Sequence, residues 1–395
     1  MIDFAPVCMK CVSKLTPPCL VCATVAFSIW LGAGVLAAQE ISPSNAQKFE
    51  QQGSFAEAAQ VWREVVKQDP NDAGAWASLG VDLSRQQKYS EAVEAYKRAL
   101  KLNQDLPGIE LNLGLAEFKQ GNFSSAIAPL KTALRSDPAN EQAQTLLGMS
   151  FYGARHFAEA VNHLKPLVQA DPENVELRQI LAQSCLDSKN YSCAEEQFRD
   201  IVRRNPDSAA AHILTGEALD GLQRTPEAIA EFQQAAKLSP REPGVHFGLG
   251  YLYWKSHRDE EARQEFEKEL ALSPTDAQSL AYLGDIELKR SHLERAASFL
   301  EKSTQQEKAP RIAFLDLGEV RGQQKQFSAA IKAYQRAIAL EPDQPDAYYR
   351  LGRIYQAAGD TEKAKAEFAK TKDLHQKADA AAVLHLNTPR PSLSQ

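Results

Sequence analysis

The chain has 395 residues, a formal net charge of −6 and 44% hydrophobic residues. A mildly acidic chain with no stripe of lysine and arginine argues against nucleic acid as the main partner. The length alone would accommodate about two or three globular domains. An internal repeat excludes that organisation, because a repeat array grows in one dimension and closes no single core.

A repeat of fixed period organises the sequence. Its copies are 34 residues long, and ten of them cover residues 39–378 without insertion or deletion. One position is always small, at Ala46, Gly80, Gly114, Gly148, Ala182, Gly216, Gly250, Gly284, Gly318 and Gly352. Another is always alanine, at Ala58, Ala92, Ala126, Ala160, Ala194, Ala228, Ala262, Ala296, Ala330 and Ala364. Apolar residues at helical spacing, such as Leu249, Tyr253 and Phe266, predict two amphipathic helices per copy.

The small residues and the prolines predict how these helices are joined. Gly250 and Ala262 are small because the two helices of a copy approach closely there, which predicts a helical hairpin with a short polar turn at 256–259. Prolines such as Pro240 and Pro274 fall between copies, because proline lacks the N–H that a continuing helix needs. One hairpin cannot bury its apolar face alone, so we expect the hairpins to stack.

This pattern resembles the tetratricopeptide repeat family. The resemblance covers the ten copies, which start at residues 39, 73, 107, 141, 175, 209, 243, 277, 311 and 345. It implies an all-α, right-handed α-α superhelical solenoid with a long concave groove. The predicted organisation is a leader at 1–38, the solenoid at 39–378, and a helix extension with a disordered tail at 379–395.

The leader is typical of a targeting segment. Two lysines precede a largely apolar run from Cys19 to Ala38, and cleavage would follow the alanine pair at 37–38. An uncleaved anchor is the alternative, since about twenty apolar residues just suffice to span a bilayer. Either interpretation predicts repeats outside the cytoplasm, in a periplasmic or secreted protein or in one anchored in the inner membrane. Translation begins at Met1 or at Met9.

The six cysteines fall into two groups. Four of them lie within the hydrophobic leader, namely Cys8, Cys11, Cys19 and Cys22. We interpret these four as incidental residues of the leader in preference to a zinc site. Cys185 and Cys193 end one helix and begin its partner in the copy that starts at 175. An oxidising compartment would permit a disulfide across that turn, and two free thiols are the alternative.

No signature of an active site occurs in the sequence. It contains no phosphate-binding loop, no zinc-protease motif, no nucleophile elbow and no dinucleotide fingerprint. The histidines never pair at i, i+4, and His212 and His246 occupy one repeat position on a face that packs, which favours structural roles. We therefore expect a non-enzymatic protein that needs no cofactor and no metal.

The resemblance places the partner-binding surface on the first helix of each copy, at its second, fifth, ninth and twelfth positions. These positions carry a mostly apolar track, namely Leu111, Leu115, Phe118, Met149, Tyr152, Leu186, Ile213, Phe247, Tyr251, Trp254, Leu288, Leu315 and Tyr349. Acidic residues at equivalent positions are Glu217, Asp220, Asp285 and Glu319.

Three aromatic residues mark the centre of this track. Phe247, Tyr251 and Trp254 stand at i, i+4 and i+7, so they share one helix face. Aromatic residues in a partly desolvated groove are typical anchors for an extended or helical peptide. We expect a partner segment that is apolar with one or two basic residues. The alternative is that the three rings pack, half-buried, against the neighbouring hairpin.

Two specialised roles of the family are not supported. Repeats that capture heat-shock chaperone termini carry lysine at the fifth position and asparagine at the ninth, where the copy from 73 has Ala77 and Val81. The repeat arm of O-linked N-acetylglucosamine transferases carries asparagines at the sixth position, where this chain matches only at Asn112. The sixth-position residues are Ser78, Asn112, Leu146, Ile180, Leu214, Gly248, Tyr282, Asp316 and Arg350.

These observations predict a non-enzymatic scaffold of a bacterial cell envelope that binds proteins or peptides in its concave groove. One alternative is an adaptor that targets a separately encoded envelope peptidase or glycosyltransferase. Another is a periplasmic holdase-type chaperone. The membrane would be contacted only through the leader, if the leader is not cleaved. The identity of the partner and the oligomeric state do not follow from the sequence.

Overall fold

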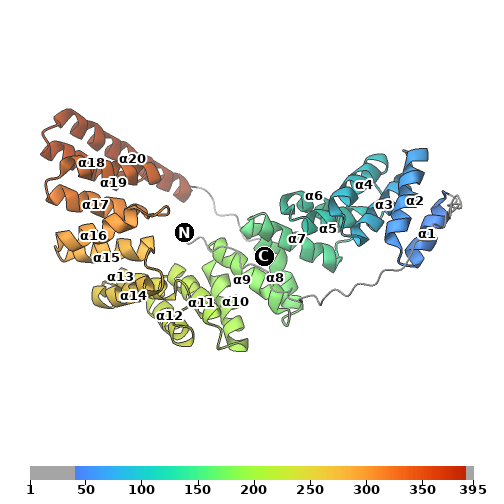
Figure 1. Ribbon diagram of the computed structural model, residues 1–395, viewed down its shortest axis with the longest axis horizontal. Helices are drawn as coiled ribbons and strands as arrows, with labels where there is room; N and C mark the ends of the chain where they lie inside the picture. The colour runs from blue at the N-terminus through green and yellow to red at the C-terminus, as the bar shows by residue number, and fades with distance from the viewer. Residues whose placement is uncertain (1–40, 388–395) are drawn as a thin grey trace, which may run out of the picture.

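The computed structural model describes residues 41–387, with side chains up to residue 380. The leader, its cysteines and the tail from residue 388 lie outside this range, so the predictions for them stay predictions. Within the range, every regular element is an α-helix, and twenty helices follow one another as ten hairpins (Figure 1). The prediction of an all-α solenoid of helical hairpins is confirmed.

The first helices of the hairpins carry odd numbers. They are α1 (Pro43–Gln51), α3 (Ala73–Arg85), α5 (Ile109–Lys119), α7 (Glu141–Gly153), α9 (Val175–Asp187), α11 (Ala209–Gly221), α13 (Val245–Lys255), α15 (Ala277–Lys289), α17 (Arg311–Gln323) and α19 (Pro345–Ala357). The second helices are α2 (Phe55–Gln68), α4 (Tyr89–Leu102), α6 (Phe123–Ser136), α8 (Phe157–Ala170), α10 (Tyr191–Arg204), α12 (Thr225–Leu238), α14 (Asp259–Leu272), α16 (Leu293–Thr304), α18 (Phe327–Leu340) and α20 (Thr361–Asn387).

The odd-numbered helices form the inner layer of the curved stack, and the even-numbered helices form the outer layer (Figure 1). Helices α3, α5, α7 and α9 contact one another in order, and so do α13, α15, α17 and α19. In the part of the chain that the structure describes, no two successive even-numbered helices pack as closely. Helices on the inside of a curve are nearer to each other than those on the outside, so the odd-numbered helices line the concave face.

Eight of the ten hairpins are closed by a glycine beneath a bulky side chain of the second helix, and alanine takes the place of glycine at Ala46 and Ala182. Gly250 lies so close to the ring of Phe266 that a Cβ atom would come within 2.8 Å of it. The same contact, between 2.5 and 2.8 Å, recurs in the pairs Gly80–Tyr96, Gly114–Leu130, Gly148–Leu164, Gly216–Phe232, Gly284–Leu300, Gly318–Tyr334 and Gly352–Phe368. The close approach predicted from the small residue at this position is therefore observed.

A hydrogen bond at the proline joins successive hairpins. In six hairpins the fourth-position side chain lies within hydrogen-bond distance of the proline carbonyl six residues earlier, in the pairs Trp76–Pro70, Gln144–Pro138, Arg178–Pro172, His212–Pro206, His246–Pro240 and Tyr348–Pro342. The other ring nitrogen of His212 and of His246 lies 2.6 Å from a carboxylate oxygen, of Glu231 and Glu265 respectively. The structural roles predicted for both histidines are confirmed.

Seven of the ten first helices begin in one of two ways. A side-chain cap accepts the backbone N–H three residues later at Asp72, Asn140, Asn174, Ser208 and Asp276. Helices α5 and α13 instead begin two residues after the repeat starts at 107 and 243, because Gly108 and Gly244 adopt left-handed φ angles of 76° and 81°. At α13 the buried Glu269 of α14 replaces the missing cap, accepting from the N–H groups of Gly244 and Phe247.

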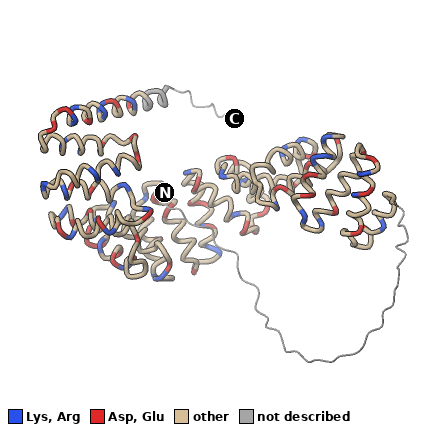
Figure 2. The backbone as a smooth tube through the Cα atoms, turned by 45° about the horizontal axis from the view of Figure 1, so that its top comes forward, with Lys and Arg blue, Asp and Glu red and all other residues tan. Residues whose placement is uncertain are grey.

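The C-terminal hairpins depart slightly from the repeat. Helix α16 has 12 residues, whereas α14 and α18 have 14. The proline that follows it is Pro310, two residues later than the repeat would place it. The last helix, α20, continues for 27 residues, as expected from the absence of a helix-breaking residue. Basic and acidic residues alternate along it (Figure 2). None of the helices between residues 41 and 387 combines the length and the apolar character needed to cross a bilayer.

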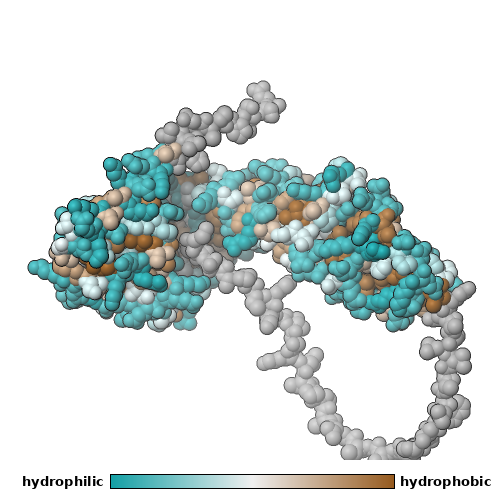
Figure 3. All heavy atoms as spheres, turned by 90° about the horizontal axis from the view of Figure 1, so that it is seen from above, coloured by the Kyte–Doolittle hydropathy of each residue, from teal (hydrophilic) through white to brown (hydrophobic). Residues whose placement is uncertain are grey.

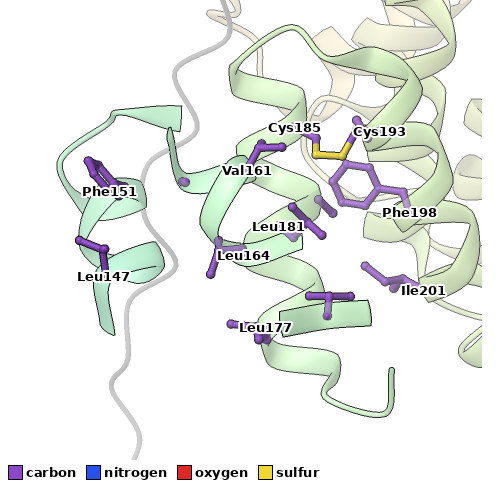
Figure 4. Close-up of a cluster of buried hydrophobic side chains, with 14 of the residues drawn as sticks. Leu147, Phe151, Val161, Leu164, Leu177, Leu181, Cys185, Cys193, Phe198 and Ile201 are labelled. Carbon is purple, nitrogen blue, oxygen red and sulfur yellow. A yellow bond between two sulfur atoms is a disulfide. The ribbon is translucent and has the colours of Figure 1, made fainter. Parts of the chain in front are cut away.

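A disulfide joins Cys185 of α9 to Cys193 of α10 across the turn of their hairpin, with the two Cα atoms 5.6 Å apart. Both cysteines are buried in a core cluster that also contains Val161, Leu181 and Phe198 (Figure 4). The bond therefore ties together two helices that already share a core.

Asp82 of α3 is a fully buried acid without a hydrogen-bond partner for either carboxylate oxygen. Burial, and to a smaller extent the charge of Glu50, raises its pKa from 3.8 to about 7. The carboxyl group is therefore held in the neutral form at mildly acidic pH.

The Gly250→Val variant should lower the free energy of unfolding by about 2 kcal/mol or more, because the added side chain must displace the ring of Phe266. Urea unfolding followed by circular dichroism measures this loss. Ala271→Val, on the exposed side of α14, controls for the introduction of a β-branched residue into a helix. Equal unfolding midpoints for the two variants would show that this glycine contact is not needed.

Replacing both Cys185 and Cys193 by alanine should lower the free energy of unfolding by about 2–3 kcal/mol, because the unfolded chain gains the freedom of the opened loop. A reducing agent should destabilise the wild-type protein to the same extent and leave the double variant unchanged. A wild-type protein indifferent to reduction would contradict this prediction.

The Asp82→Asn variant should flatten the dependence of stability on pH. Between the pKa of 3.8 in the unfolded chain and about 7 in the fold, the folded protein holds a proton that the unfolded chain releases. Stability therefore falls as the pH rises through this window. Thermal unfolding should give similar midpoints for both proteins at pH 4 and a higher midpoint for the variant at pH 8. Parallel curves would mean that Asp82 does not titrate in this window.

Candidate partner-binding groove

The predicted groove residues all lie on the inner layer of helices. They are Leu111, Leu115 and Phe118 on α5, Met149 and Tyr152 on α7, Leu186 on α9, Ile213, Glu217 and Asp220 on α11, Phe247, Tyr251 and Trp254 on α13, Asp285 and Leu288 on α15, Leu315 and Glu319 on α17, and Tyr349 on α19. Hydrophobic patches bordered by hydrophilic residues appear on both halves of the face seen in Figure 3.

The exposure of these residues is uneven. Most are partly exposed, and half of the surface of Tyr349 is open to solvent. Ile213, Asp285 and Leu315 are buried, with 7–9% of their surface exposed. Ile213 packs in the same core cluster as Leu249, so its side chain stabilises the stack and offers little surface to a partner.

An open cleft of about 290 Å³ lies between α9 and α11. Its lining includes the inner-layer residues Tyr152, Gln179, Ile180, Gln183, Ala210, Ala211 and Leu214, together with Phe198 and Ile201 of α10. Helices α9 and α11 pack less closely than α7 and α9 do, which leaves this space between them. The mixture of apolar walls with glutamine amides suits an apolar side chain that is carried on a peptide backbone.

Acidic residues follow the cleft along the same two helices. Glu217 lies one turn beyond Leu214, and Asp187 lies one turn beyond Gln183. Burial, and then the charge of Asp187, raises the pKa of Glu217 to about 7. Asp220, in contrast, pairs with Lys255 of α13 at 2.6 Å. The acidic margin predicted for the groove is therefore partly neutralised within the chain.

The aromatic residues of α13 form a cluster with the next hairpin. Tyr282 of α15 stacks on Phe266, with ring centroids 5.4 Å apart, and meets Trp254 edge-on at 4.8 Å. Phe247 and Tyr251 lie 6.0 and 5.7 Å from the same ring. Phe247, Tyr251 and Trp254 nevertheless remain partly exposed. These rings pack against the neighbouring hairpin and still present one side to the groove.

Trp254 is held in place by a charged pair on α15. Its indole N–H donates to Asp285 at 2.5 Å, and the ammonium of Lys289 contacts the same carboxylate oxygen at 2.7 Å. The Lys289 nitrogen also lies 4.7 Å from the centre of the Trp254 ring. The groove thus already holds one cation between an aromatic face and a carboxylate.

Asp316 of α17 lies beside this pair and is 6% exposed. Its Oδ2 atom is buried and accepts no hydrogen bond. Burial, then the charge of Asp285, raises the pKa of Asp316 to about 7, while Arg350 and Lys289 oppose the rise and Glu319 adds to it. Glu319 itself accepts a hydrogen bond from the hydroxyl of Tyr334 at 3.2 Å.

Several residues that shape this surface were absent from the predicted groove. Ile180, Leu214, Tyr282 and Asp316 all occupy the sixth position of their repeats. The signal in the sequence that indicates them is the change along this row from apolar residues to Tyr282, Asp316 and Arg350. The contact of Lys289 with Trp254 depends on the packing of two hairpins, and no signal in the sequence indicates it.

The geometry of the described residues offers little for catalysis. No group of three or more histidine, cysteine, aspartate or glutamate side chains between residues 41 and 380 could hold a metal ion. The three carboxyl groups whose pKa values are raised to about 7, Asp82, Glu217 and Asp316, lie on three different helices. The inner face is a long, partly apolar surface with acidic residues at separate places along it.

Three solved structures illustrate the likeness in fold. Yeast Tom70 is 12% identical, with a TM-score of 0.41 over 89% of this chain and 96% of its own. A tetratricopeptide repeat protein from Parabacteroides merdae is 20% identical, with a TM-score of 0.44 over 66% and 99%. MamA from Desulfovibrio magneticus RS-1 is 22% identical, with a TM-score of 0.39 over 44% and 97%. No partner or activity follows from these similarities, and no curated protein sequence matches the chain.

Family models match nearly all of the solenoid. One tetratricopeptide repeat model matches residues 45–107, 78–141, 111–151, 215–277 and 247–310, which together make up just over half of the chain. Two further tetratricopeptide repeat models match 151–217 and 346–378, and a TPR repeat model matches 318–359. With the hairpin geometry described above, these matches show that the chain belongs to the tetratricopeptide repeat family, whose arrays of helical hairpins are scaffolds for protein interactions.

Proposed function

We propose that this protein is an exported, non-enzymatic scaffold of a bacterial cell envelope that binds peptide segments of partner proteins along its inner face. The observation that carries the proposal is the track of partly exposed apolar and aromatic side chains on the odd-numbered helices α5, α7, α9, α13, α15 and α19. A track of this kind suits a long segment better than a small molecule, because its contacts are spread over many hairpins.

Two points on the track would anchor such a segment. The cleft between α9 and α11 would take an apolar side chain, and the aromatic cluster of α13 would take a second. Large side chains in partly desolvated surroundings contribute most of the binding energy in interfaces. The charged residues between the anchors would set the orientation of the segment more than its affinity.

Export is supported by the leader-like composition of residues 1–38 and by the disulfide between Cys185 and Cys193. A structural disulfide persists in an oxidising compartment and is rare where thiols are kept reduced. Attachment to the inner membrane through an uncleaved leader is compatible with the same observations.

The full chain, expressed with its own leader, should recover a specific partner in a crosslinking pull-down from envelope extract. The variant carrying Tyr251→Ala and Trp254→Ala should lose that partner, because it removes the aromatic anchors while keeping the inner helix. Circular dichroism must first show that the two proteins are equally helical.

A matched control removes two aromatic residues from the outer helices, with Tyr89→Ala and Phe327→Ala, and should retain the partner. A partner that survives the inner substitutions would place binding elsewhere and overturn the proposal. Recovery of one enzyme would identify an adaptor role, and recovery of many unrelated unfolded proteins would identify a chaperone.

A further inference from the structure

Beside the aromatic cluster of the groove lies a carboxyl group whose environment is incomplete. We call its surroundings the acidic corner, which consists of Trp254, Tyr282, Asp285, Asp316 and Glu319. Asp316 lies at the centre, almost fully buried, with Oδ2 unpartnered. Buried polar atoms are normally hydrogen-bonded, so an orphan acceptor on a binding surface indicates a missing donor.

The chain itself does not supply that donor. The ammonium of Lys289 is taken by Asp285 at 2.7 Å. Arg350 of α19 is near enough to influence Asp316 electrostatically, yet no ion pair or hydrogen bond joins the two side chains. Tyr282 also lies close to both aspartates, and no hydrogen bond connects its hydroxyl to either.

Charge counting indicates what kind of donor fits. The acidic corner contains the carboxyl groups of Asp285, Asp316 and Glu319, and Lys289 and Arg350 are the cations whose charges lower the pKa of Asp316. When Asp316 is ionised, three carboxylates face these two cations, so one further positive charge would balance the ionised form. A neutral donor could occupy the orphan acceptor, but only a cation would also remove the repulsion between neighbouring carboxylates.

The aromatic rings favour a cation as well. Lys289 already stands over the face of Trp254 at 4.7 Å, which shows that this ring accepts a positive charge. Tyr282 meets Trp254 edge-on at 4.8 Å and thereby forms a second wall of the corner. Lys289 is exposed on its outer side, so a second basic side chain can enter beside it or displace it.

We propose that the acidic corner receives an arginine or lysine side chain of the partner segment, which donates to Asp316 and lies against Trp254 and Tyr282. This inference rests on the proposed function and adds to it the chemistry of the partner. The partner segment carries a basic residue at this point, next to the apolar residue that contacts Phe247 and Tyr251. Free amines share this donor chemistry, but they lack the neighbouring apolar anchor.

Selection of a random peptide library displayed on phage tests the inference. The full chain should enrich peptides that carry arginine or lysine beside apolar residues. Selection on the Asp316→Asn variant should enrich apolar peptides without that basic residue. Asparagine has the shape of aspartate, and the native Oδ2 atom makes no hydrogen bond, so the variant should fold and be at least as stable as the wild type in urea.

The best peptide then allows a double-mutant cycle by fluorescence anisotropy. Replacing its arginine with citrulline, or its lysine with norleucine, should weaken binding to the wild type about 10- to 100-fold and change binding to Asp316→Asn little. Glu196→Gln removes the same charge from the outer helix α10 and should leave both affinities unchanged. Arg350→Gln removes a competing cation and should strengthen binding of the basic peptide.

The outcomes separate this inference from the proposed function. The acidic corner does not receive the basic residue if the enriched peptides lack basic residues, or if citrulline weakens binding to wild type and to Asp316→Asn equally. Either result would leave the proposal of a peptide-binding groove intact. If no peptide is enriched, or if enrichment survives Tyr251→Ala with Trp254→Ala, the groove itself is not the binding site and both proposals fail.

Discussion

In eight of the ten hairpins, a glycine of the first helix lies directly beneath a bulky side chain of the second helix. At Gly250 the ring of Phe266 fills the space where a Cβ would stand, and seven other hairpins repeat this arrangement. It sets the spacing of the two layers, because helices that touch backbone to side chain cannot separate without opening a cavity. The inner layer, and therefore the groove, exists because this spacing is nearly constant along the chain.

The junction between hairpins determines how that groove curves. The fourth-position side chain of a first helix lies within hydrogen-bond distance of a proline carbonyl in the preceding connection. The turn that follows the previous second helix therefore has a defined hydrogen-bond partner. Different side chains make this bond, so the repeat tolerates variation in sequence at one geometry. Where the inner helices part, between α9 and α11, the disulfide of the α9–α10 hairpin lies close by, and a cleft opens on the concave side.

The surface that we propose for partner binding is also part of the packing. Trp254 and Tyr282 meet edge-on between two hairpins and remain partly exposed, and Asp285 orients the indole while neutralising Lys289. The packing and binding interpretations of the aromatic stripe therefore do not exclude each other. Asp316 differs from its neighbours, because its buried Oδ2 atom receives no hydrogen bond from within the chain.

The sequence by itself determined the repeat length, the hairpins and the position of the inner helices, because the residues that specify them interact within one 34-residue copy and recur in every copy. It also indicated the aromatic stripe, since helical spacing alone brings Phe247, Tyr251 and Trp254 to one face. Only the tertiary structure decided that Ile213 is buried, that α9 and α11 part, and that Tyr282, Asp285 and Asp316 meet Trp254. These features arise between neighbouring hairpins. The distance between two hairpins depends on how the side chains of two copies fit together, and a pattern within one copy cannot predict that fit.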